Sequence, residues 1–180
     1  MKNQITKKLA YAALFLALCL VLPMLTGQIP QIGSMLLPMH IPVLLCGLVC
    51  GWQYGAAVGF VAPLLRSVLF GMPPMYPVAI AMAFELLTYG LVIGLVYRRM
   101  AQKGAAGVYA ALLAAMVAGR LVWGVAEVVL LGLGGKAFTA QAFLAGALLN
   151  AVPGIIVQLV LIPAVMAALQ KAGAVKEYAE

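Results

Sequence analysis

Charged residues are what this sequence has least of. Only 8% of its 180 residues are charged, whereas 66% are hydrophobic. A soluble domain averages about 25% charged and about 45–50% apolar residues. A soluble fold of this length could not bury so much apolar surface, but a lipid bilayer can surround it. The composition therefore predicts an integral membrane protein formed by a single domain.

Acidic residues and histidine are scarcer still. The four acidic residues are all glutamates, so a protease with paired aspartates is excluded. The single histidine, His40, and the glutamates do not have the spacing of metal ligands, so no metal site is predicted. No P-loop pattern occurs, and ATP hydrolysis is therefore not expected from this chain. These absences favour a protein that is not an enzyme and holds no cofactor, with an intramembrane hydrolase using His40 as the alternative.

The hydrophobic residues form six runs near the length that a transmembrane helix needs, which is roughly 20 residues. Helices are predicted because the runs lack the alternation of barrel strands and because a helix satisfies its own backbone hydrogen bonds. The last run contains Pro153-Gly154, where we expect a bend or a break. The sequence thus predicts an all-α bundle of six transmembrane helices. Its segments are residues 8–26, 33–51, 54–70, 77–97, 106–133 and 141–170.

The lysines and arginines predict how the chain is oriented. With the N-terminus inside, the external stretches hold only Lys136. The positive-inside rule then places both termini in the cytoplasm, in a multi-pass protein of the cell membrane. The net charge is +7, and the basic residues that produce it lie beside apolar runs. They therefore indicate how the protein is oriented in a membrane and do not indicate nucleic-acid binding. The basic residues of the cytoplasmic stretches are Lys2, Lys7, Lys8, Arg98, Arg99, Lys103, Lys171 and Lys176.

Ionisable side chains inside the predicted spans are costly in lipid and therefore indicate a functional site. In the predicted orientation nearly all of them lie in the outer half of the membrane, which favours a pocket open to the outside. Arg120 and Glu127 are seven residues apart, so two helical turns bring them to one face, with Trp123 between them. The predicted substrate-binding residues are Arg120, Trp123, Glu127, Glu85, Asn150, Arg66, His40 and Tyr89.

A structural interpretation of the same residues stays open. Two arginines and two glutamates sum to zero, so they could neutralise one another as buried ion pairs. His40 could likewise be a packed or hydrogen-bonded side chain. The protein would then be a structural or regulatory membrane subunit without a ligand.

Small residues recur at four-residue spacing, which lets helix backbones approach closely. The glycines at positions 47, 51, 55 and 59 flank a tight connection between the second and third segments, and their spacing indicates packing. Ala13 and Ala17 form a shallow groove on the first segment. That groove could pack inside the protein or against a partner.

Several stretches together resemble the substrate-binding S components of energy-coupling factor (ECF) transporters. The resemblance covers most of the chain and is most specific around His40, Pro63 and Glu85. The stretches are GSMLLPMHIPVLL at 33–45, GFVAPLLR at 59–66, GMPP at 71–74, ELLTYG at 85–90, GRLVWG at 119–124 and NAVPG at 150–154.

The resemblance implies six helices with both termini inside and a vitamin or related micronutrient bound from the outside. It also implies partners, namely a membrane-embedded coupling subunit and two cytoplasmic ATPase subunits. Ala13 and Ala17 match the alanine pair with which the first helix of the family docks on the coupling subunit. The substrate itself does not follow from the resemblance. Two arginines suit an anionic ligand, and pantothenate is the best candidate, with cobalamin, pyridoxine-type and queuosine-type ligands as alternatives.

Overall fold

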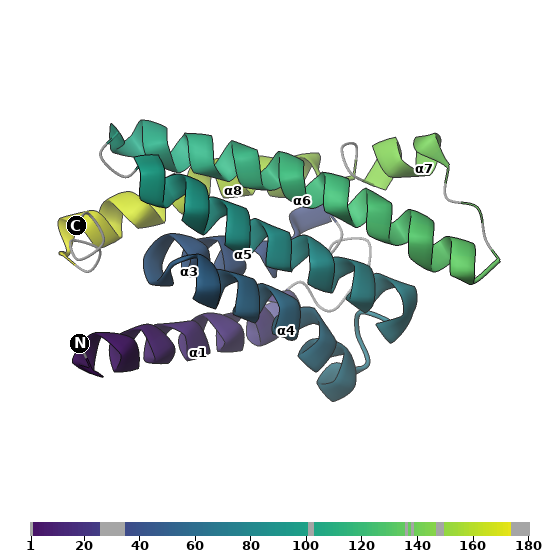
Figure 1. Ribbon diagram of the computed structural model, residues 1–180, viewed down its shortest axis with the longest axis horizontal. Coiled ribbons are helices and arrows are strands. Elements are labelled where there is room, and N and C mark those ends of the chain that lie inside the picture. The colour runs from purple at the N-terminus through teal and green to yellow at the C-terminus, as the bar shows by residue number, and fades with distance from the viewer. Residues whose placement is uncertain are drawn as a thin grey trace.

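A computed structural model of the chain describes residues 2–25, 35–100, 103–135, 137, 139–146 and 150–173. Throughout these ranges the regular structure is helical, as the sequence predicts. Figure 1 shows the long helices lying side by side in a bundle. The principal elements are α1 (Lys2–Leu25), α3 (His40–Cys50), α4 (Trp52–Phe70), the π-helical turn Met75–Ala79, α5 (Ile80–Met100), α6 (Ala105–Leu133), α7 (Ala140–Leu144) and α8 (Val152–Lys171).

Five of the helices in the described ranges are long and apolar enough to cross a membrane. The segment that corresponds to the second predicted span is the 11-residue helix α3, which is apolar but short. It begins only at His40 because Leu37 has a positive φ of 51° and precedes Pro38, which disfavours helical backbone at the residue before it. Residues 33 and 34 of that prediction lie outside the described ranges. A bundle of six spanning helices is therefore not confirmed.

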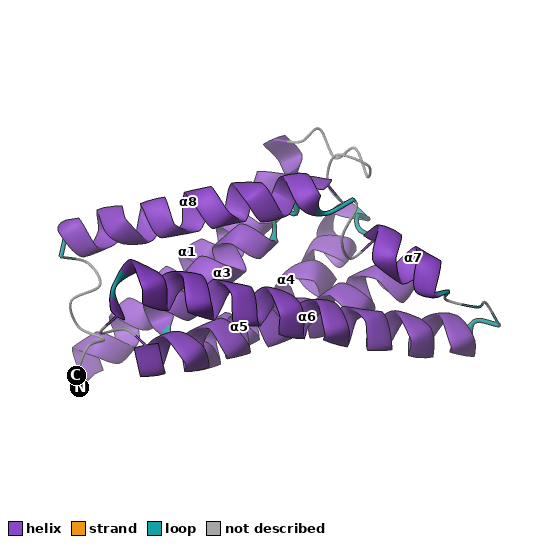
Figure 2. Ribbon diagram, turned by 90° about the horizontal axis from the view of Figure 1, so that it is seen from above, coloured by secondary structure: helices purple, strands orange, loops and turns teal. Residues whose placement is uncertain are grey.

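The ends of the helices agree with an up-and-down arrangement. The start of α1 and the end of α8 lie at the same end of the bundle (Figure 1). Figure 2, which views the bundle from above, also shows the start of α1 and the end of α8 at the same end. Lys7 and Lys8 near the start of α1 and Lys171 at the end of α8 thus belong to one end. Which side of the membrane this end faces stays a prediction.

Glycines hold α3, α4 and α5 close together. Gly51, with φ 97°, is the single residue between α3 and α4, so the predicted tight connection is confirmed. A Cβ atom added to Gly90 of α5 would lie 2.2 Å from the carbonyl carbon and oxygen of Gly55 on α4. A Cβ on Gly47 of α3 would lie 2.8 Å from the Gly90 oxygen. The predicted packing role of Gly47 and Gly55 is therefore confirmed.

Helix α3 lies in the interior of the bundle, and its buried residues include His40, Val43, Leu44 and Cys46. The last predicted segment, 141–170, is divided between α7 and α8. Helix α8 begins at Val152, with a proline in its first turn, where the missing N–H costs no hydrogen bond. The expected break near Pro153-Gly154 is thus found just before it.

Candidate functional site

Three ionisable side chains from three helices meet inside the bundle. Glu85 of α5 places its Oε1 atom 2.9 Å from Nη1 of Arg120 on α6 and 3.4 Å from Nε2 of His40 at the start of α3. His40 and Glu85 are each only 1% exposed. Neither contact has the geometry of a hydrogen bond, because Glu85 Oε1 has no such partner within the described part of the chain, and the contact with His40 is ionic only when the imidazole is protonated. We call these three residues the ionic cluster.

Tyr89 joins the ionic cluster from one helical turn further along α5. Its ring meets the His40 ring edge to face, with 5.1 Å between the centroids and 80° between the planes. Gly119 makes room for this ring on α6, because a Cβ there would lie 2.7 Å from Cε2 of Tyr89. The tyrosine and the glycine thus let α5 and α6 approach at the level of the cluster.

Trp123 extends the site along α6, toward α7. The guanidinium carbon of Arg120 lies 5.9 Å from the centroid of the Trp123 ring, within the range of a cation–π contact. On α7, Phe143 stacks on Trp123 with a centroid distance of 6.1 Å and an interplanar angle of 26°. Helix α7 therefore fixes the aromatic side chain that lies next to the arginine.

Several buried polar atoms of the bundle lack a hydrogen-bond partner among the described residues. They include Nε and Nη2 of Arg120, both ring nitrogens of His40 and Nε2 of Gln158. Glu127, two turns beyond Arg120, is 7% exposed and forms no ion pair within the described ranges. The ion pair between Arg120 and Glu85 therefore leaves several hydrogen-bond donors and acceptors of these residues without a hydrogen-bond partner in the described part of the chain.

Arg66 lies elsewhere. Its side chain is 2% exposed, and Nη1 donates a hydrogen bond to the backbone oxygen of Leu20 on α1, at 2.5 Å. Its guanidinium also lies over the ring of Phe70, 5.3 Å from the centroid. These contacts join α4 to α1 and do not include the ionic cluster. Its predicted place at the rim of a pocket stays a prediction.

Asn150 is exposed, in the turn before α8. Its backbone N–H donates to the oxygen of Ala145, and residues 147–149 beside it are outside the described ranges. Its membership of the pocket also stays a prediction. Two other residues are not among the predicted binding residues. Gln158, 1% exposed on α8, is visible in the sequence as a lone amide in an apolar run, whereas Phe143 gives no signal there.

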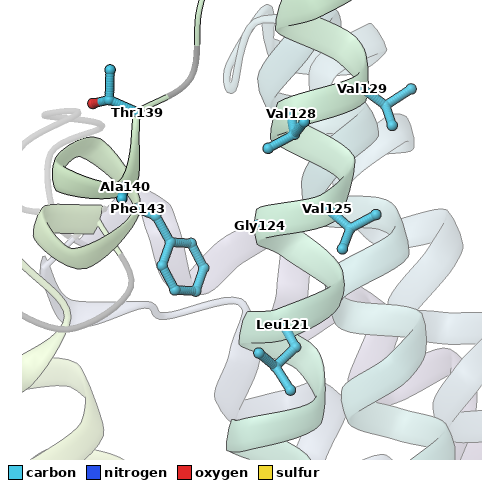
Figure 3. A pocket seen from close by; sticks show the side chains of 8 residues that line it. All are labelled: Leu121, Gly124, Val125, Val128, Val129, Thr139, Ala140 and Phe143. Atoms are coloured by element: carbon cyan, nitrogen blue, oxygen red, sulfur yellow. The ribbon is translucent and has the colours of Figure 1, made fainter.

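An open apolar groove of about 370 Å³ lies between α6 and α7. Figure 3 shows the ring of Phe143 pointing from α7 toward α6 near Gly124. The groove is lined by Leu121, Gly124, Val125, Val128, Val129, Thr139, Ala140 and Phe143. It thus contains none of the predicted substrate-binding residues, whose ionic cluster lies deeper in the bundle.

A family model described as the substrate-specific component of ECF transporters matches residues 7–167. The chain belongs to this family. No curated protein and no solved structure matches the chain. Proteins of this kind are the substrate-binding subunits of ECF transporters and are not themselves enzymes.

The family membership confirms the resemblance noted in the sequence and makes this S component a membrane protein of small-molecule uptake. It implies a small-molecule substrate and assembly with the membrane and ATPase subunits of an ECF transporter. The intramembrane hydrolase and the subunit without a ligand are not favoured by it.

Proposed function

We propose that this S component takes up a small vitamin-like anion and that Arg120 binds the anionic group of this ligand. Pantothenate is the ligand that we favour. The observation that carries the proposal is the free edge of the Arg120 guanidinium. Nη1 is engaged by Glu85, whereas Nε and Nη2 have no acceptor within the described residues. The two N–H groups on that edge point in parallel, as a carboxylate requires for two simultaneous hydrogen bonds.

The environment of Arg120 favours strong binding at this edge. Its side chain is only 13% exposed, so the hydrogen bonds to a ligand would form away from competing water. Glu85 already offsets the charge of the arginine and also holds the guanidinium in place. Recognition therefore rests on directed hydrogen bonds more than on net charge. We further propose that the ligand enters from the outer side of the membrane, which the positive-inside orientation predicts.

Pantothenate suits this site because it has a carboxylate for Arg120 and hydroxyl groups for other polar side chains. The test is the thermal midpoint of the purified chain in detergent, measured with a panel of vitamins. A ligand at 100 times its Kd stabilises the protein by about 2.7 kcal/mol, so we expect a clear rise in the midpoint with pantothenate. The cobalamin, pyridoxine and queuosine classes belong in the same panel. Stabilisation by none of the vitamins would contradict the proposal.

We also propose that Ala13 and Ala17 form the docking groove for the coupling subunit. Both side chains lie on the exposed side of α1, whereas Ala12 and Phe15 face the core. Replacing Ala13 and Ala17 by Trp is expected to prevent a partner helix from approaching closely, and thus to reduce copurification of the coupling subunit by at least tenfold. Vitamin affinity should change little, because the groove faces away from the bundle.

A matched control for the alanine pair is Val117→Trp on α6, an equally bulky change at a side chain that is 63% exposed. This variant should assemble normally. Equal losses of assembly and vitamin affinity in the alanine variants would show instead that the groove serves internal packing.

A further inference from the structure

We infer that the ligand has two polar ends, an oxyanion bound by Arg120 and a hydrogen-bond donor bound by Glu127. The inference rests on the proposed function and narrows its substrate class. The donor can be a hydroxyl, an amide N–H or an ammonium group. The two residues are seven positions apart on α6, which places their Cα atoms about 10 Å apart along the helix axis. We therefore infer an elongated ligand, with its two polar groups near opposite ends.

The first end of the site is the Nε–Nη2 edge of Arg120. Both nitrogens are buried and have no acceptor within the part of the chain that the structure describes. Because a guanidinium only donates hydrogen bonds, the group that satisfies this edge must be an acceptor. An oxyanion with two acceptor oxygens matches the edge best.

The second end is the carboxylate of Glu127. The Glu127 residue as a whole is only 7% exposed, and it forms no ion pair with the described residues. A buried carboxylate requires donors to offset its lost hydration. An ionised carboxylate only accepts hydrogen bonds, so the ligand group beside it must be a donor. The two ends of the site thus require opposite chemistry from the ligand.

The stretch of α6 between the two ends is apolar. Arg120 and Glu127 face the same side of the helix, since seven residues complete nearly two turns. Trp123 lies between them and is held in place by its stacking on Phe143. An apolar middle section would lie against this surface. A compact anion such as nicotinate cannot reach both ends, and a cation such as thiamine lacks the group that Arg120 requires.

The experiment compares matched ligands on the unmodified chain in detergent, by calorimetry or thermal shift. The first series is pantothenate, its dideoxy analogue N-(3,3-dimethylbutanoyl)-β-alanine, and pantothenol, which lacks the carboxylate. The second series is biotin, biotin methyl ester and octanoate, which lacks the ureido donors. Nicotinate represents anions without a distant donor.

We expect one of the two parent compounds to bind, and each of its truncated analogues to bind about 10- to 100-fold more weakly, as the loss of a hydrogen bond to a charged group implies. The donor tested is the one distant from the carboxylate, namely the hydroxyls of pantothenate or the ureido N–H groups of biotin. Equal affinity of the parent and the analogue that lacks this distant donor would overturn the inference while leaving anion binding intact. Binding of nicotinate as tightly as any other compound would do the same. Binding of no anion at all would overturn the proposed function and the inference with it.

A variant adds an independent readout. Glu127→Gln keeps the size of the side chain and removes its charge. It should weaken the binding of the two-ended parent about tenfold and leave the affinity of the analogue without the distant donor unchanged. An equal change in both affinities would indicate a structural role for Glu127 and would overturn the inference. Because the ligand series uses the unmodified protein, the inference remains testable even if this variant fails to fold.

Discussion

Replacing Arg120 by Ala is expected to weaken the binding of an anionic vitamin by about 2–5 kcal/mol, which is the range for removing one partner of a buried charge pair. This corresponds to roughly a 30-fold to several-thousandfold rise in Kd. The effect has two parts. The ligand loses the donors Nε and Nη2, and Glu85 loses the partner that lies 2.9 Å from its Oε1 atom. Calorimetric titration of the purified variant measures the loss.

Two matched variants separate these parts. Arg120→Lys keeps a positive charge near Glu85 but lacks the two parallel donors, so it should retain folding better than affinity. Arg66→Ala removes a guanidinium that contacts α1 and Phe70, so it should lower the thermal midpoint with little change in affinity. Monodispersity in detergent establishes that each variant is folded. A folded Arg120→Ala protein with unchanged affinity would contradict the proposal and favour a purely structural ion pair.

Replacing Gly90 by Ala is expected to destabilise the fold by about 1–3 kcal/mol, or to prevent folding, as overpacking of a close contact does. The added Cβ would lie 2.2 Å from the carbonyl carbon and oxygen of Gly55. Backbone atoms cannot rotate away as a side chain can, so α4 and α5 would have to separate. The thermal midpoint of the variant without a ligand measures the effect.

Gly132→Ala on α6 is the matched control for Gly90, because a Cβ at that position meets no atom within 4 Å. Alanine also favours a helix over glycine by about 1 kcal/mol. The control should therefore be neutral or stabilising. A Gly90→Ala protein as stable as this control would show that the close approach of α4 and α5 can relax at little cost.

Long apolar runs predicted most of the helices well. The segments 54–70 and 106–133 correspond closely to α4 and α6, because a run of that length in lipid has few alternatives to a helix. The second segment was predicted too long, since apolar composition alone does not show that the backbone leaves helical geometry at Leu37. The division of the last segment was expected from Pro153, but the separate helix α7 was not.

The structure brings some of the predicted residues into contact, whereas their role in binding stays a prediction. The contact between Glu85 and Arg120 agrees with the rule that charges in lipid need partners. The same rule could not locate Arg66, whose partner is the backbone oxygen of Leu20. Every residue carries such an oxygen, so no sequence pattern distinguishes this one. Likewise, the contact between Trp123 and Phe143 depends on how α7 lies against α6, and residue spacing does not give that placement.

The contact between Arg66 and Leu20 bears on how mechanical load passes through the bundle. Helix α1 exposes Ala13 and Ala17 on one side, and its Leu20 oxygen accepts the hydrogen bond from Arg66 on α4. A partner bound to the alanine face would exert force directly on α1. The Arg66 guanidinium binds α1 to α4, and glycines allow α4 to pack closely on α5. A force on α1 would therefore be transmitted to α5, the helix that carries Glu85. A force applied at the alanine face would thus be shared by the other helices and would not act on the first helix alone.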